Sequence, residues 1–147
     1  MTEQLQARTI ADFGEQWTAF PETDGFFGSA ELFDDFLGPL VRAADVAGCR
    51  VCEIGAGTGR FVNVLVDSGA AHVIALEPSA AFDVLRSSTS VHADRVTCLR
   101  LTGDRLPPTG DLDYVFSIGV LHHMPKNGFF PSIIANAVGF PGRTAMP

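Results

Sequence analysis

Carboxylates and closely spaced glycines are the residues of this chain whose types and positions could bind a ligand. Glycine occupies every second position of Gly55–Gly59, directly after the apolar stretch 51–54, which contains Glu53. Glu77 closes the next apolar stretch, about 20 residues beyond the glycines, and Asp104 follows the stretch after that. Because glycine has no Cβ, the backbone there can take a positive φ or approach a ligand closely. The pattern predicts a binding site where strands turn into helices.

The spacing of the glycines limits the kind of ligand. A dinucleotide fingerprint needs Gly-x-Gly-x-x-Gly, but Arg60 occupies the position that would complete it, and the third glycine comes one residue earlier. A dinucleotide would also place its phosphates near Glu53, Glu77 and Asp104, where Arg60 and Arg105 are the candidate cations. The three carboxylates favour a cationic ligand, and an NAD(P)-dependent oxidoreductase domain remains the alternative.

The elements that would position these residues alternate between apolar strands and helices. The helical pattern after the glycines runs to about Ser68, where Gly69 ends it. Ser79 is a candidate N-cap for the next helix. This alternation predicts an α/β fold with a Rossmann-like, doubly wound, mainly parallel sheet in the order 3-2-1-4. The predicted strands are residues 51–54, 73–76, 95–101 and 113–120.

Residues 1–45 are predicted to form a leader and helical cap. Residues 1–9 are polar and expected to be frayed, whereas residues 10–28 carry several aromatic side chains between glycine and proline. Ser29 is a plausible N-cap for an amphipathic helix that Gly38-Pro39 should kink or divide. The aromatic side chains either cover a bound ligand or pack on the sheet.

Composition and charge disfavour several classes of protein. The chain has 147 residues, 46% of them apolar, which is enough for one hydrophobic core. A net charge of −7 makes nucleic-acid binding unlikely, because that function usually needs a basic patch. The first twenty residues contain no apolar signal region, and no apolar run reaches the length of a membrane span. We therefore predict a cytoplasmic protein without membrane partners.

The cysteines are not expected to bind a metal. Cys49 and Cys52 have the spacing of a Cys-x-x-Cys pair, but on a strand side chains three residues apart point to opposite faces. The chain also lacks a second pair that would complete a zinc site. We interpret these two residues and Cys98 as small apolar side chains.

The pattern acidic-x-Gly-x-Gly-x-Gly resembles motif I of the class I S-adenosylmethionine-dependent methyltransferases. GDRL at 103–106, and DYVFS with VLHH within 113–123, are similar to later motifs of that family and occur in the same order. The resemblance implies that Glu53 holds the methionine amino group, that Glu77 accepts the ribose hydroxyls and that Asp104 receives the adenine amino group. The cofactor-binding residues that it implies are Glu53, Gly55, Ala56, Gly57, Gly59, Glu77, Pro78, Asp104, Arg105, Ser117 and Ile118.

The implied reaction transfers the activated methyl group of S-adenosylmethionine to a nucleophile and leaves S-adenosylhomocysteine. The protein then mainly supplies alignment and a dry site. His122 or His123 is a candidate general base, because imidazole titrates near neutral pH, or else the pair only shapes the pocket. No catalytic residue is assigned. The aromatic leader favours a small-molecule acceptor.

The stretch 126–147 does not continue the family pattern beyond the predicted core at 46–125. It scatters glycine and proline, and lacks the later helix and strands that the resemblance implies. We therefore expect a C-terminally truncated methyltransferase with an irregular tail, incomplete or inactive by itself. Its fourth strand would be an apolar edge able to pair with a second copy or another partner. The remaining hypotheses are a half that a partner completes and a non-catalytic interaction module.

Overall fold

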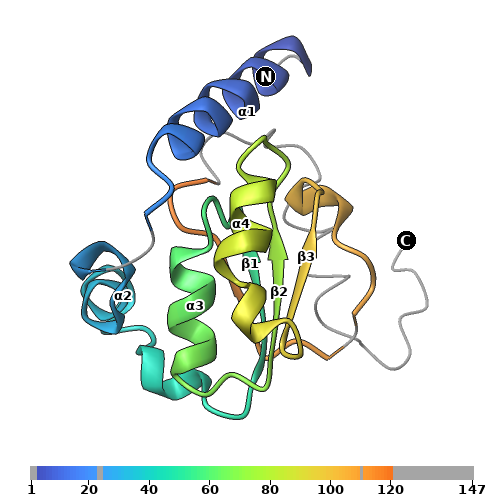
Figure 1. The fold of residues 1–147 in the computed structure, drawn as a ribbon. Coiled ribbons are helices and arrows are strands. Elements are labelled where there is room, and N and C mark those ends of the chain that lie inside the picture. Colours follow the sequence, from blue (N-terminus) through green and yellow to red (C-terminus); the bar gives the residue numbers. More distant parts are fainter. Residues whose placement is uncertain (1–2, 23–24, 110, 121–147) are drawn as a thin grey trace.

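The computed structural model describes residues 3–22, 25–109 and 111–120 of the chain (Figure 1). Its α-helices are α1 (Glu3–Ala19), α2 (Ala30–Leu37), α3 (Arg60–Asp67) and α4 (Phe82–Ser88). Short 3-10 helices are η1 (Phe26–Gly28), η2 (Ala43–Val46), η3 (Ser90–His92) and η4 (Gly103–Arg105). The strands are β1 (Arg50–Ile54), β2 (His72–Leu76), β3 (Val96–Leu99) and β4 (Tyr114–Phe116).

The four strands form one parallel sheet in the order β3-β2-β1-β4, as the sequence predicts. β1 pairs with β2 from Arg50↔His72 to Ile54↔Leu76, and it pairs with β4 on its other side. Because all strands run the same way, their carboxyl ends lie at one edge of the sheet. Helix α1 crosses this edge (Figure 1). The predicted Rossmann-like α/β fold class is confirmed.

The two faces of the sheet bury separate hydrophobic clusters, because side chains alternate between faces along each strand. Val51 belongs to the larger cluster, on the face that α3 and α4 cover (Figure 1). Cys52 and Ile54 belong to the smaller cluster, which includes Leu106 of the loop before β4. Cys49 packs against the larger cluster, so the predicted separation of Cys49 from Cys52 is confirmed.

Several local signals place the helix ends where the sequence predicts them. The Ser29 hydroxyl accepts a hydrogen bond from the Leu32 N–H at 3.1 Å and caps the start of α2. α2 ends at Leu37, directly before Gly38-Pro39, and the chain does not form a second α-helix before β1. α3 ends at Asp67, followed by Gly69 with a φ of 96°. Among the described helices, none is both long and apolar enough to cross a membrane.

Three expectations about local structure are wrong. Residues 3–9 are not frayed but belong to α1, which rests on the sheet edge through its buried Gly14. Ser79 is not the N-cap of α4; that position is Ala81, and the Ser79 hydroxyl accepts from the Ala81 N–H in the preceding turn. β4 stops at Phe116 rather than extending to 120, because the chain then bends toward the glycine loop.

Candidate functional site

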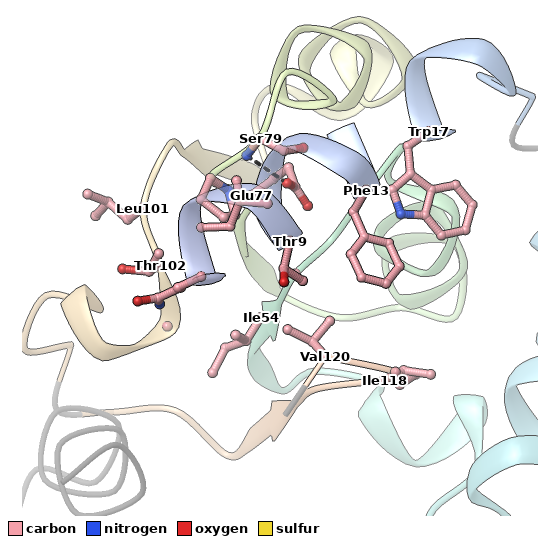
Figure 2. Close-up of a pocket in the computed structure, with 16 residues that line it drawn as sticks. Thr9, Phe13, Trp17, Ile54, Glu77, Ser79, Leu101, Thr102, Ile118 and Val120 are labelled. Atoms are coloured by element: carbon pink, nitrogen blue, oxygen red, sulfur yellow. Dashed lines mark hydrogen bonds between the residues drawn. The ribbon is translucent and has the colours of Figure 1, made fainter. Parts of the chain in front are cut away.

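A cavity of about 320 Å³ lies between α1 and the carboxyl ends of the strands (Figure 2). Its floor is formed by the strand ends and the chain that follows them, including Ile54, Glu77 and Val120. Phe13 and Trp17 of α1 project toward it from above (Figure 2). The described loops of the sheet and the leader helix therefore enclose one site at the position where parallel α/β folds bind ligands.

The glycine loop fits between neighbours that leave no room for side chains. Gly55 has a φ of 75°, and a Cβ there would overlap the side chain of Val120. Gly59 has a φ of 89°, and a Cβ there would lie 2.9 Å from the Leu85 side chain. The Gly55 and Ala56 N–H groups both donate to the Leu76 carbonyl, at 2.8 and 2.9 Å. These contacts fix the loop against β2 and the C-terminal half of α4.

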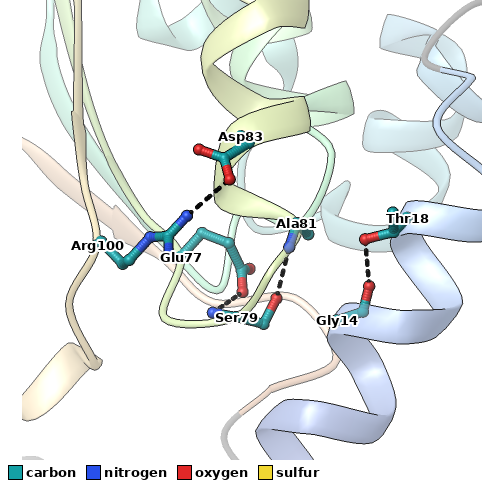
Figure 3. A network of polar contacts seen from close by, with 7 residues as sticks. All are labelled: Gly14, Thr18, Glu77, Ser79, Ala81, Asp83 and Arg100. Atoms are coloured by element: carbon teal, nitrogen blue, oxygen red, sulfur yellow. Dashed lines mark hydrogen bonds and ion pairs between the residues drawn. The ribbon is translucent and has the colours of Figure 1, made fainter.

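Glu77 connects the glycine loop to the loop after β2. Its buried carboxylate accepts from the Gly57 N–H at 2.8 Å. It also accepts from the Ser79 N–H at 2.8 Å (Figure 3). Each carboxylate oxygen has a second lone pair, so these bonds leave Glu77 able to accept from a ligand as well. Because Glu77 also lines the cavity, it can shape the site and bind within it.

Glu53 is buried beneath the glycine loop without a full set of partners. Its side chain is 3% exposed, and its Oε2 has no hydrogen-bond partner in the described structure. Burial raises the pKa of Glu53 to about 8; the Arg60 guanidinium opposes that shift and the Glu77 carboxylate adds to it. An unsatisfied buried carboxyl is costly, which indicates a place for a donor group that the described residues do not supply.

Arg60 joins α1 to the glycine loop. It is the first residue of α3, and its guanidinium lies 4.8 Å from the centre of the Trp17 ring. The same ring lies 3.6 Å from the position that a Cβ on Gly57 would occupy. Burial lowers the pKa of Arg60, and the Glu53 carboxylate partly offsets this. The cation–π contact and the ring's contact with the loop hold this end of α1 over the site.

A second point of contact between α1 and the sheet edge is Gly14. It is the buried residue of α1, and a Cβ there would lie 2.9 Å from the Ser79 Cβ and 3.0 Å from the Ala80 N. The helix therefore approaches the loop after β2 more closely than any side chain would permit. Figure 3 shows Gly14 and Thr18 of α1 beside the Glu77–Ser79 loop.

The structure brings most of the sequence-predicted residues to this site. Gly55, Glu77, Pro78 and Ile118 line the cavity, while Ala56, Gly57 and Gly59 complete the adjoining loop. The Ser117 hydroxyl beside them is buried without a described partner. Asp104 and Arg105 are exposed on η4 and line a neighbouring hollow, whereas Thr102 and Gly103 line the cavity. His122 and His123 lie outside the described residues.

The part of the site that sequence reasoning missed is the first half of α1. Gln6, Thr9 and Ile10 line the cavity although their segment was predicted to be mostly frayed. Gln6, Ile10, Phe13 and Trp17 recur at helical spacing, so they lie on one face of α1. That spacing is the signal that could have predicted the whole helix and its inner face.

Comparisons with known proteins agree on one family. The model of the methyltransferase domain matches residues 52–136. Residues of this chain are 34% identical over 77 residues to the tRNA U34 carboxymethyltransferase of Shewanella sediminis, a match that covers 50% of this chain and 23% of that protein. The same enzyme of Shewanella pealeana is 35% identical over 83 residues, covering 53% and 24%. The matched region is thus about a quarter of the length of these curated relatives.

Solved structures show the same fold. One is phosphoethanolamine N-methyltransferase 1 of Haemonchus contortus in complex with phosphoethanolamine and S-adenosylhomocysteine. It superposes on this chain with a TM-score of 0.65 at 18% identity, and the match covers 93% of this chain and 30% of that one. An S-adenosylmethionine-dependent methyltransferase of Mesorhizobium loti has a TM-score of 0.51 at 26% identity, covering 63% and 41%.

Proposed function

This chain belongs to the methyltransferase-domain family, and we propose on that premise that the cavity under α1 binds S-adenosylmethionine for methyl transfer. The observation that carries the proposal is the convergence of the glycine loop, Glu77 and the unsatisfied Glu53 at one edge of the sheet. The residues present suit this cofactor, because its ammonium is a donor that Glu53 lacks and its ribose hydroxyls are donors for Glu77. Apolar walls from Phe13, Trp17 and Val120 suit its nonpolar parts.

The proposed roles of the remaining residues follow from their places around the cavity. Gly55, Ala56, Gly57 and Gly59 let the cofactor approach the backbone, and Ser117 with Ile118 closes the side near β4. Pro78 and the η4 segment, with Asp104 and Arg105, would border the adenine. We also propose that residues 1–45 act as the cover and residues 46–125 as the binding core.

When bound, S-adenosylmethionine would supply a methyl group activated by a sulfonium, which an acceptor nucleophile can attack with S-adenosylhomocysteine as the leaving group. The chain's own contribution is to align the acceptor and to exclude water, which α1 does by covering the strand ends. His122 and His123 remain candidates for moving a proton from the acceptor. A small-molecule acceptor is the preferred hypothesis, because α1 encloses the site with aromatic side chains and the chain carries a net charge of −7.

The tRNA substrate named for the Shewanella enzymes makes RNA the rival acceptor.

A cytoplasmic location is the preferred compartment, because all three cysteines are free thiols. Pairing of the β4 edge with a second copy remains a hypothesis that light scattering at several concentrations would test.

The test of this function is a calorimetric titration of the purified chain with S-adenosylmethionine, with NADH as the control ligand. Saturable binding of S-adenosylmethionine without binding of NADH would support the proposal. Glu77→Gln should weaken that binding by about 1–2 kcal/mol, because an amide replaces a charged acceptor. Binding of NADH alone by the folded chain would contradict the proposal.

A further inference from the structure

Large apolar side chains are exposed on η1, on α2 and in the turn after α2. Their exposed fractions are 51% for Phe26, 65% for Phe27, 58% for Phe36 and 88% for Leu40. η1 contacts α2, and the Phe26 and Phe27 rings meet edge to face with their centres 6.0 Å apart. We call these four side chains the apolar patch. Single exposed apolar residues are common, but several on adjoining elements indicate an interaction surface.

The base of the apolar patch is anchored in the core. Phe33 of α2 is fully buried, and its ring centre lies 5.6 Å from that of Phe61 and 5.4 Å from that of Phe116. Ser29 caps the start of α2, and the Phe36 ring lies 6.1 Å from the Phe61 ring. The helix contacts α3 on the side away from α4 (Figure 1). The exposed rings therefore stand on a rigid support, which lowers the entropy cost of binding a partner.

The charges around the apolar patch have one sign. Residues 20–41 contain acidic side chains but no lysine or arginine. Glu31 and Asp35 are exposed one turn apart on α2, and neither forms an ion pair with a described residue. Glu31 suits the helix N-terminus, but Asp35 lies in the last turn, where a negative charge is unfavourable. Helix stability therefore does not explain this second carboxylate.

The sign of the charge decides which partner fits the surface. Nucleic acids and anionic lipid membranes are negatively charged, so these carboxylates would repel them. A second copy of the chain would place the same acidic side chains opposite one another in a two-fold contact. A basic protein segment complements both features. Its apolar side chains would cover the rings, and its arginines would stack on phenylalanine and pair with the carboxylates.

We propose that the apolar patch, together with Glu31 and Asp35, is a docking site for an arginine-rich amphipathic segment of a partner protein. The site is separate from the cavity under α1, and the inference does not rest on the proposed function. α2 is about 12 Å long, so a few helical turns of the partner would cover the patch.

The probe for this site is a fluorescein-labelled synthetic peptide of leucine and arginine, about 18 residues or five helical turns long, with its leucines on one face. Fluorescence anisotropy measures its affinity for the full chain. Two control peptides carry glutamate in place of arginine or serine in place of leucine. The unmodified chain should bind the leucine–arginine peptide about tenfold or more tightly than either control, because only this peptide complements both the rings and the carboxylates.

Two double variants separate the two parts of the site. Phe26→Ser combined with Phe27→Ser should weaken binding of the leucine–arginine peptide about tenfold, because two rings no longer become buried on binding. Glu31→Gln combined with Asp35→Asn should weaken it about fivefold at low ionic strength. That second loss should shrink in about 1 M salt, where the charges are screened.

Val91→Ser combined with Asp94→Asn is the matched control, because Val91 is 80% exposed and Asp94 is an exposed acid three residues away. This variant should bind the leucine–arginine peptide as the unmodified chain does. All these side chains are exposed, so urea denaturation should give unchanged midpoints. If the double phenylalanine variant fails to fold, Leu40→Ser repeats the test in the turn after α2, where it should weaken binding of the peptide.

Three results would overturn the inference. The first is that the unmodified chain does not bind the leucine–arginine peptide, or binds all three peptides equally. The second is undiminished binding by the folded variants of the patch. The third is a loss in the control variant as large as the losses in the patch variants, which would show that the peptide binds exposed apolar and acidic side chains wherever they occur.

Discussion

The two walls of the cavity are built in different ways. The floor is the glycine loop and the ends of β1 and β2, where Ala56 and Glu77 are buried and the loop's backbone is bonded to its neighbours. The cover is α1, in which Gly14 is the buried residue and most side chains are exposed. Burial of apolar area and backbone hydrogen bonds stabilise the floor, whereas few buried contacts hold the cover.

Because the two walls differ in this way, substitutions in them should affect different properties of the protein. Changes in the floor should reduce the free energy of unfolding, because the floor is continuous with the core. Changes in the cover should leave the fold in place and alter ligand binding, because α1 contributes cavity lining more than core. Segments with few buried contacts also open locally at lower free energy than the rest of a domain.

The largest effect is expected at Gly59 in the floor. Gly59→Ala should lower the free energy of unfolding by about 3 kcal/mol for two reasons. The backbone φ of 89° is strained for alanine, and the new Cβ would lie 2.9 Å from the side chains of Leu85 and Ser88. Gly69→Ala is the matched control: its φ is 96°, but its Cβ would lie 3.5 Å from Ala47, an ordinary contact. Urea denaturation of both variants measures the difference, and equal losses would contradict the steric argument.

The floor was predictable from the sequence because its causes are local. Alternating glycines after an apolar strand, and Glu77 after the next, specify turns that few other residues permit, and parallel pairing then brings them together. The cover was only partly predictable. Phe13 and Trp17 indicated a cap, but the helical spacing of Gln6 and Ile10 was hidden in a polar stretch. The close approach of Gly14 to Ser79 depends on tertiary packing that sequence spacing does not encode.

The same reasoning explains why β3 and β4 end earlier than the sequence predicts. Residues 113–120 are as apolar as a long strand, yet the chain leaves the sheet after Phe116, so that Val120 contacts Gly55. Asp104 has the position in sequence of a strand-end carboxylate, but β3 ends at Leu99 and the intervening turn leaves Asp104 exposed on η4. Strand ends depend on competing contacts, which periodicity alone does not reveal.

Glu53 is an exception within the stable floor, and the second prediction concerns it. Its pKa in the folded chain is about 8 against an ordinary value of 4.5, so the folded chain retains a proton that the unfolded chain releases between those values. The stability associated with the protonated carboxyl is complete below pH of about 4.5 and is lost as the pH rises to about 8. The difference between those pKa values corresponds to about 5 kcal/mol at high pH. Burial of the Gln amide offsets part of it, so Glu53→Gln, which stays neutral, should be more stable than the unmodified chain at high pH by about 2 kcal/mol.

Denaturant unfolding across that pH range measures the advantage of Glu53→Gln, which should fade toward acid pH. An advantage that does not vary with pH would show that Glu53 is not the titrating group. The same variant should bind S-adenosylmethionine more weakly, because Gln does not offer a carboxylate to the ammonium. Stability gained together with affinity lost would identify Glu53 as a buried group maintained for a ligand.

A third, smaller effect is expected from Gly14 in the cover. Gly14→Ala favours the helix itself by about 1 kcal/mol, but its Cβ would contact Ser79 and Ala80 at 2.9 and 3.0 Å. We expect α1 to stay helical and move away from the loop, so that affinity for S-adenosylmethionine falls about tenfold while the free energy of unfolding changes by less than about 1 kcal/mol. Calorimetry measures the affinity for S-adenosylmethionine, and amide hydrogen exchange measures whether α1 moves away from the loop. Unchanged affinity together with unchanged exchange would show that the close approach is not required.

The smallest effect is expected on the outer face of the same helix. Arg8 and Asp12 form an ion pair of 3.9 Å, with side chains 80% and 70% exposed, so water and salt screen the attraction. Their order is also the less favourable one for an i, i+4 pair, because the cation precedes the acid along the helix. Arg8→Ala should therefore change the free energy of unfolding by less than about 0.5 kcal/mol and leave the affinity for S-adenosylmethionine unchanged. Calorimetry could instead show a loss of affinity comparable to that of Gly14→Ala. The whole helix, and not its inner face alone, would then control ligand binding. The contrast between a helix that lines the cavity and a core that supports it would fail.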